Sequence, residues 1–341
     1  MLHSIYRYIA VTLCGLSATL SANSSEPILT DTHRFTEIRD NIWLAQTTEP
    51  VFNSNALVII NEDDVVLIDS HVTPNKARQL IESIKVLTSN PITTLINSHH
   101  HWDHAHGNQV FADIPIIGHE FTYMRLATTP LEEPTYVRGL EGNASGLVRI
   151  QGQIDAEQDP EKKQDLQEYL AIFSAHVNDF DEIDPIPPTI TMNDRMTLFR
   201  GDREMQIIFL GRAHTGGDLA VYFPDSKVVF TGDMAFAGPS FLGDGYVDEW
   251  PQTLRNLAKL DFDIFVPGHG GPVTDLSRLE LVALYYEDLW EKSEALHHAG
   301  VPYEQAAKTI DLTNHTEIPI RNIGADPLAI ERIYYRLENP D

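Results

Sequence analysis

The stretch that decides the fold is ITTLINSHHHWDHAHGN, residues 92–108. Its first residues are β-branched or aliphatic and predict a buried strand. A His-x-His-x-Asp-His pattern follows at once, formed by His99, His101, Asp103 and His104. The pattern therefore lies on the loop at the carboxyl end of a strand, which is where α/β proteins place their sites.

The spacing within this pattern suits metal ions. His99 and His101 are two residues apart in an extended segment, so their side chains point the same way and can share one ion. Asp103 and His104 come where the backbone turns, and they can serve a second ion. A solvated histidine-rich loop is the alternative, but histidine is scarce, and the full pattern directly after a strand favours a metal site.

Three further candidate ligands follow predicted strands and lie beside glycine. They are His214 after residues 205–210, Asp233 after residues 228–231 and His269 after residues 264–266. Taken singly, each is an ordinary loop or turn residue. Their shared placement at strand ends, together with the histidine pattern, favours one common site.

Strands and helices alternate along the chain, with hairpins early in each half. Strands are expected at 56–60, 65–68, 92–96, 114–117, 196–199, 205–210, 219–223, 228–231 and 264–266, and helices at 74–86, 250–260, 276–298 and 327–337. Ser277 and Glu280 predict a capping box for the third helix. The order indicates two sheets covered by helices rather than one parallel sheet. Residues 120–185 carry polar residues at helical spacing and predict a helical insertion closed by prolines.

The N-terminus is typical of a secretory signal. Arg7 precedes an apolar run at residues 9–20, and small residues follow. We expect a signal peptide at residues 1–22 and a flexible lead-in at 23–36, with an uncleaved anchor helix as the alternative. The single cysteine, Cys14, lies in the apolar run, and the large Leu13 before it disfavours lipidation. The mature chain then has no thiolate, so a metal site must use His, Asp and Glu.

The charge composition excludes some classes of binding partner. The 341 residues hold 24 Lys and Arg against 50 Asp and Glu, a formal net charge of −26. Such a field repels polyanions, so nucleic acid and anionic membrane surfaces are poor candidates. We expect a small-molecule substrate and no membrane insertion of the mature chain.

With these residues in view, the chain resembles the metallo-β-lactamase-fold hydrolase superfamily. The matching features are Asp69 at the end of an early strand, the histidine pattern, His214, Asp233 and His269. The resemblance covers about residues 35–120 and 190–275. It implies an α/β fold, an αββα four-layer sandwich, as a single domain over residues 37–341 with a helical insertion at about 120–188.

The resemblance also implies two metal sites bridged by one carboxylate. The first would be His99, His101 and His214, the second Asp103, His104 and His269, and Asp233 would bridge them. Nitrogen and oxygen ligands suit zinc best, with iron or manganese open. Asp69 would orient the histidine loop from behind the ligands. His100 and His106 flank the ligands of the pattern. The sequence does not decide whether they line the pocket or are simply exposed.

The implied activity is that of a secreted or periplasmic di-metal hydrolase. A metal-bridging hydroxide would attack an ester, thioester, lactone or β-lactam bond, with Asp103 also orienting the hydroxide. The resemblance implies that β-lactamases of this fold generally lack the bridging aspartate, so Asp233 points to a glyoxalase-II-like or lactonase-like ligand set. Two alternatives stay open: a non-catalytic metal-binding accessory protein, and a mono-iron dioxygenase-like member.

Overall fold

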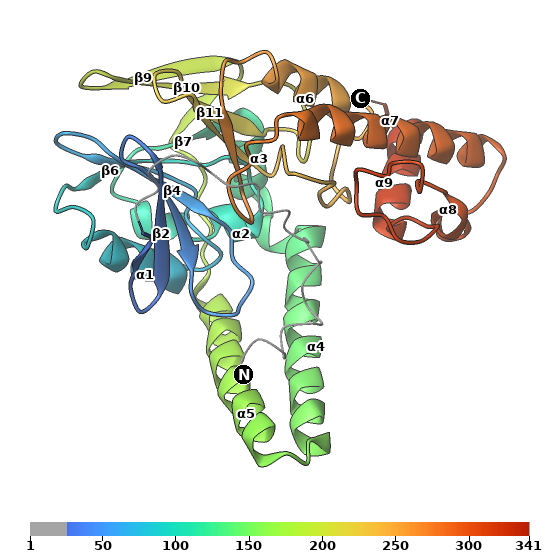
Figure 1. Ribbon diagram of the computed structural model, residues 1–341, viewed down its shortest axis with the longest axis horizontal. Helices are drawn as coiled ribbons and strands as arrows, with labels where there is room; N and C mark the ends of the chain where they lie inside the picture. The colour runs from blue at the N-terminus through green and yellow to red at the C-terminus, as the bar shows by residue number, and fades with distance from the viewer. Residues whose placement is uncertain (1–25, 341) are drawn as a thin grey trace.

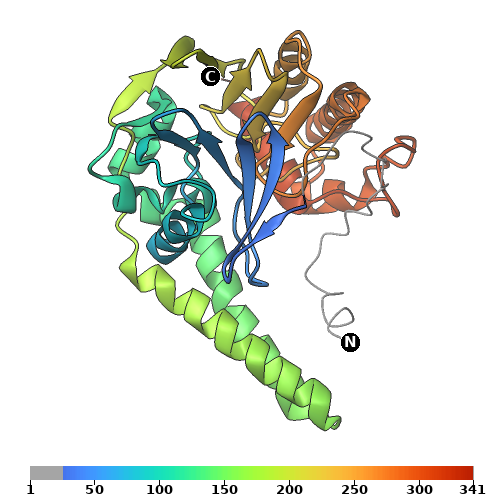
Figure 2. The ribbon, with the colours of Figure 1, turned by 60° about the vertical axis from the view of Figure 1, so that its left-hand side comes forward.

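The computed structural model describes residues 26–340. Two β-sheets lie face to face between layers of helices (Figures 1 and 2). The expected signal peptide at residues 1–22 lies outside the described residues. Within them, no helix is both long enough and apolar enough to cross a membrane.

The first sheet has eight strands in the order β1 to β8. Their bounds are β1 Ile28–Leu29, β2 His33–Arg39, β3 Ile42–Thr47, β4 Ala56–Ile60, β5 Val65–Ile68, β6 Ile92–Ile96, β7 Ile116–His119 and β8 Ile190–Met192. Strands β1 to β5 pair antiparallel, whereas β5 to β8 pair parallel. The parallel half therefore places the carboxyl ends of β5 and β6 at one edge.

The second sheet has five strands in the order β13-β12-β11-β10-β9. Their bounds are β9 Arg195–Arg200, β10 Arg203–Phe209, β11 Leu219–Phe223, β12 Val228–Gly232 and β13 Ile264–Pro267. Only β12 and β13 pair parallel; the remaining pairs in this sheet are antiparallel. The carboxyl ends of β12 and β13 consequently lie side by side.

The helices cover both outer faces. Their bounds are α1 Pro74–Ile84, α2 Trp102–Ala105, α3 Glu120–Thr128, α4 Pro134–Ala156, α5 Pro160–Asn178, α6 Trp250–Leu257, α7 Ser277–His298, α8 Tyr303–Thr309 and α9 Pro327–Glu338. Helix α1 packs on the outer face of the first sheet, and α6, α7 and α9 pack on that of the second.

Side-chain alternation explains the four layers. In β3, Leu44 faces the second sheet, whereas Trp43 faces the layer of α1, because successive residues of a strand point to opposite faces. In the second sheet, Val221 packs between the sheets, whereas Tyr222 packs in the cluster with α6 and α7. The expected αββα sandwich is therefore confirmed.

Helices α3, α4 and α5 fall within the expected insertion. Helices α4 and α5 form a hairpin that extends away from the sheets in both views (Figures 1 and 2). A small cluster of Ile150, Ile154 and Leu166 joins the two helices. At the root of the hairpin, Tyr136 and Phe180 pack together against the loop that carries the histidine pattern.

Two local predictions are wrong. The flexible lead-in at residues 23–36 overlaps β1 and the start of β2, where His33 and Phe35 are fully buried. Alternating polar residues on the exposed face hid this strand. The predicted capping box of α7 is absent as well, because Ser277 is already inside the helix, and its hydroxyl donates to Asp275 at 2.5 Å.

Candidate metal centre

The structure brings all seven predicted ligands together at the edge where the two sheets present their strand ends. His99, His101, Asp103 and His104 follow β6, and the others follow β10, β12 and β13. Six of the seven are buried, and His269 is the partly exposed one. The rigid strands therefore fix where each ligand enters the site.

Three imidazoles form the first group. Ring nitrogens of His99, His101 and His214 all lie within 4.8 Å of one another. The closest pair is His214 Nε2 and His101 Nδ1, which are 2.9 Å apart. Three convergent nitrogens at this spacing can bind one divalent ion.

A carboxylate and two imidazoles form the second group. Asp103 Oδ2 lies 2.9 Å from His269 Nε2 and 3.3 Å from His104 Nε2. The three donor atoms again lie within 4.8 Å of one another. This group is open to solvent on the side of His269.

Asp233 lies between the two groups. Its Oδ1 is 3.3 Å from His104 Nε2, and its Oδ2 is 3.5 Å from His214 Nε2 and 3.7 Å from His269 Nε2. A third set of mutually close donors joins Asp233 to His99 and His104. One carboxylate thus faces ligands of both groups, as a bridging ligand must.

Orphaned polar atoms show that the donor set fits a metal. His99 Nε2, His104 Nε2 and Asp233 Oδ1 are buried and have no hydrogen-bond partner among the described residues. Leaving buried polar atoms unpaired is costly, and a cation at this point would satisfy all three. Burial lowers the pKa of His104, but the charges of Asp103, Asp233 and nearby Asp69 outweigh it and raise that pKa well above its ordinary value. The same negative charge favours a bound cation.

Asp69 holds the histidine loop as expected. Its Oδ1 accepts from Ser98 N at 2.7 Å, and its Oδ2 accepts from Ser98 Oγ at 2.7 Å. The same Oδ2 lies 2.8 Å from His104 Nδ1, the ring nitrogen that faces away from the ligand groups. Asp69 is fully buried, so these contacts fix the orientation of the His104 ring.

Sequence reasoning missed a second orienting carboxylate, Asp244. Its Oδ2 lies 3.1 Å from His101 Nε2, which leaves His101 Nδ1 facing the ligand group. Burial raises the pKa of Asp244, but the hydrogen bond and charge of His101 outweigh this and lower it below its ordinary range. The same loop provides Phe241 O, which lies 3.1 Å from His214 Nδ1. A lone aspartate in a glycine-rich loop gave no motif by which to find it.

Aromatic side chains line the open side. Phe52 stacks on His269 with ring centroids 5.3 Å apart, and it is 53% exposed. Phe236 stacks on the same imidazole, with centroids 6.4 Å apart. Trp250 is instead fully buried, and its Nε1 donates to Met234 O. The exposed part of the site is therefore an apolar wall around a metal-binding edge.

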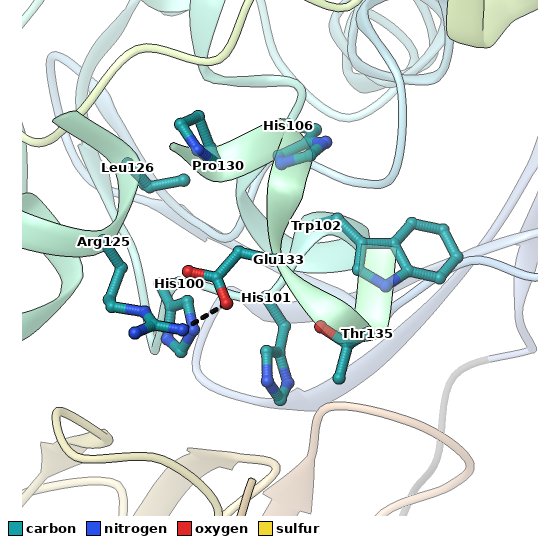
Figure 3. Close-up of a pocket in the computed structure, with 9 residues that line it drawn as sticks. All are labelled: His100, His101, Trp102, His106, Arg125, Leu126, Pro130, Glu133 and Thr135. Carbon is teal, nitrogen blue, oxygen red and sulfur yellow. Dashed lines mark hydrogen bonds and ion pairs between the residues drawn. The ribbon is translucent and has the colours of Figure 1, made fainter. Parts of the chain in front are cut away.

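The flanking histidines are buried, which answers the question that the sequence left open. His100 and His106 both line a small pocket behind the histidine loop (Figure 3). The ion pair between Arg125 and Glu133 closes this pocket beside His100. Neither histidine belongs to a potential metal-binding group among the described residues.

Comparison with known proteins agrees with this architecture. Residues 50–269 match the family model described as Metallo-beta-lactamase superfamily. A curated relative, the alpha subunit of 2,4-dinitroanisole O-demethylase from Nocardioides sp. (strain JS1661), is 25% identical over 264 residues. That match covers 76% of this chain but only 62% of the relative, so the chain spans less than two thirds of the relative's length.

Solved structures share the fold at low identity. A stereoselective inverting sec-alkylsulfatase from Pseudomonas sp. aligns with a TM-score of 0.61 and 16% identity, covering 89% of this chain and 50% of that one. A metallo-beta-lactamase from Pontibacter korlensis aligns with a TM-score of 0.51 and 18% identity, covering 74% of this chain and 99% of that one. At such identities the likeness extends to the fold alone.

Proposed function

Because this chain belongs to the metallo-beta-lactamase superfamily, we propose that it is a hydrolase with two metal ions, zinc being the first choice. The first ion would be held by His99, His101 and His214, the second by Asp103, His104 and His269, and Asp233 would bridge them. The observation that carries the proposal is the position of Asp233, whose two oxygens face ligands of both groups.

Two divalent ions at this spacing would supply a water of lowered pKa and stabilise negative charge that develops on the substrate. The chain's own residues prepare that chemistry. Asp103 Oδ2, on the open side beside His269, is placed to orient the attacking water and to accept its hydrogen bond. Asp69 and Asp244 hold the rings of His104 and His101, so the ligands need little reorganisation.

The aromatic wall favours a substrate with an apolar part. Phe52 and Phe236 flank His269 and would cover that part while excluding bulk water from the reacting bond. We place ester, thioester and lactone bonds first because the resemblance implies that β-lactamases of this fold generally lack the bridging aspartate that we propose for Asp233. β-Lactams stay in the screen.

A second candidate activity is cleavage of an aryl methyl ether. The supporting observation is the 25% identity over 76% of this chain to a protein named as a subunit of an O-demethylase. Substrate screening separates the two candidates. A periplasmic or secreted location also stays a proposal, since it rests on the character of residues 1–22.

Metal content is the first test. We expect about two equivalents of metal per mature chain purified without chelator, falling in both His99→Ala and Asp233→Ala. His298→Ala, an exposed histidine at the end of α7, is the matched control and should keep both equivalents. About one equivalent that Asp233→Ala leaves unchanged would remove the bridging role and favour a mono-iron reading.

Turnover is the second test. Metal-loaded protein should hydrolyse at least one member of a panel of esters, thioesters, lactones, β-lactams and aryl methyl ethers. Asp103→Asn should lower kcat strongly, because it removes the carboxylate placed to orient water. Two bound metal ions with no turnover on any panel member would favour the non-catalytic accessory role instead.

A further inference from the structure

A second cavity lies beside the candidate metal centre, and Asp244, which lines this cavity, contacts the predicted ligand His101. Its volume is about 200 Å³, and no predicted metal ligand lines it. Five separate segments build it: His100 of the histidine loop, helix α3, residues 215–216, residues 244–246 and helix α9. Helix α9 comes from the part of the chain beyond the family match, which ends at residue 269. One wall of this cavity is therefore built by residues outside the matched segment.

The lining is basic in a strongly acidic protein. Arg125, Arg332 and Arg336 all face the cavity, and Asp244 is the one carboxylate among the lining residues. Arg125 pairs with Glu133, and Arg336 pairs with Asp248 and Glu249, outside the cavity lining. With an excess of 26 acidic over basic residues in the chain, such a concentration of arginine is not expected by composition.

Arg332 is distinct because its charge is not neutralised. Its Nε donates to Gly245 O at 2.9 Å, but within residues 26–340 no carboxylate lies within 4.0 Å of it. The guanidinium lies over the rings of Tyr246 and Tyr335, at 5.2 and 5.3 Å from their centroids. Stacking on two aromatic rings holds the guanidinium plane in place without consuming its terminal N–H donors.

Other buried nitrogens of the lining residues also lack a hydrogen-bond partner. Both ring nitrogens of His100 and the Nε of Arg125 are buried without a hydrogen bond in the described part of the chain. His100 is only 4% exposed. A group with several acceptor oxygens would accept from Arg125 Nε and from the one ring N–H of His100, and it would pair with the charge of Arg332.

The geometry points to a binding site for an oxyanion group, such as a carboxylate, sulfate or phosphate, with Arg332 as its principal partner. The single lining carboxylate, Asp244, directs Oδ2 at His101 Nε2, and three arginines line the cavity against it. The group can be the anionic end of a substrate or a free inorganic anion. The first source rests on the proposed hydrolase function, whereas the second does not.

Sulfate is the probe for the site itself. Titration of metal-loaded protein with sulfate at constant ionic strength should show saturable binding by calorimetry. Arg332→Gln should weaken this binding at least ten-fold, and Arg332→Lys should weaken it less because it keeps the charge but loses the planar fork. Arg34→Gln removes an exposed arginine of β2 and should bind within two-fold of the wild type. Metal content measured in each variant excludes an effect through lost ions.

Absence of saturable sulfate binding by the wild-type protein would overturn the inference. So would a Kd for Arg332→Gln equal to that of the wild type. Should Arg332→Gln not fold, an unchanged Kd in Arg332→Lys would also overturn it, since a fork-shaped contact is part of the proposal.

Paired substrates separate the two sources of the anion. The two substrates of a pair contain the same hydrolysable bond. Elsewhere in the molecule, one carries a free carboxylate and the other carries the methyl ester of that carboxylate. A kcat/KM ratio that favours the carboxylate and falls in Arg332→Gln would assign the site to the substrate. An unchanged ratio beside weakened sulfate binding would assign it to a free anion. Arg332-dependent sulfate binding with no turnover of any substrate would refute the hydrolase proposal and leave this site standing.

Discussion

Asp69→Asn is the substitution that most sharply tests how the second metal group is held. The aspartate accepts from Ser98 N through Oδ1, and from Ser98 Oγ and His104 Nδ1 through Oδ2, with all three distances between 2.7 and 2.8 Å. Asparagine has the same shape, and it tolerates the positive φ of 62° at this position. The variant therefore changes hydrogen bonding while leaving packing and backbone in place.

The amide cannot reproduce the contacts in either orientation. With its oxygen towards Ser98 N, its NH2 group faces His104 Nδ1, which then has to give up its proton and accept. The proton moves to Nε2, the atom that lies 3.3 Å from both Asp103 and Asp233. A protonated Nε2 cannot bind a metal ion. With the amide reversed, its NH2 group faces Ser98 N, and a buried donor is left unpaired.

We expect the second metal equivalent to bind about 10- to 100-fold more weakly in Asp69→Asn, or about 1.4–2.7 kcal/mol. Chelator competition measures that affinity, and ¹⁵N NMR of the imidazole reports which nitrogen of His104 carries the proton. Asp64→Asn is the control, since it removes a hydrogen-bonded carboxylate at the opposite end of β5 from Asp69. Second-site affinity within two-fold of the wild type would refute the orienting role.

Two other perturbations test the packing of the site and the acid stability of the fold. Gly268→Ala should abolish binding of the second metal equivalent, because the added Cβ would clash with Asp233 Oδ1. In the control Gly271→Ala the added Cβ has no atom within 4 Å, so elemental analysis should find the normal metal content. Burial and the charge of Lys76 lower the pKa of His33 from 6.5 to about 4, so the unfolded chain takes up the proton first as pH falls. About 3 kcal/mol of unfolding free energy should be lost through His33 as the pH falls from 6.5 to 4. Urea titrations of His33→Gln should lack that loss. If the unfolding free energies of the variant and the wild type depend on pH in parallel, this role of His33 is wrong.

The ligands could be predicted because each one is tied to the end of a strand with a clear hydrophobic pattern. Strand β6 has the predicted bounds, and the histidine pattern begins three residues after its last residue. Strands β12 and β13 pair parallel, so the residues after them, Asp233 and His269, arrive at the same edge. Register and direction within the sheets thus convert sequence order into spatial proximity.

What could not be predicted depends on contacts that leave no local pattern. Strand β2 was not predicted because polar residues on its exposed face interrupt the hydrophobic pattern, although its buried face carries His33 and Phe35. Asp244 reaches His101 from 143 residues further along the chain, on a loop with no regular structure. Arg332 returns from α9 to the same neighbourhood. Tertiary packing alone brings such residues to the site, so residue spacing is silent about them.

The position of Trp102 argues that the helical insertion supports the metal loop rather than only extending the surface. This tryptophan lies between the ligands His101 and Asp103, and its ring packs against Phe180 at 5.8 Å between centroids. From α4, a Cβ built on Gly139 would lie only 2.8 Å from the same ring, so helix and indole are in close contact. A displacement of the hairpin root would therefore reach two ligands through one rigid side chain. The insertion and strand β6 consequently both hold the loop that carries the histidine pattern.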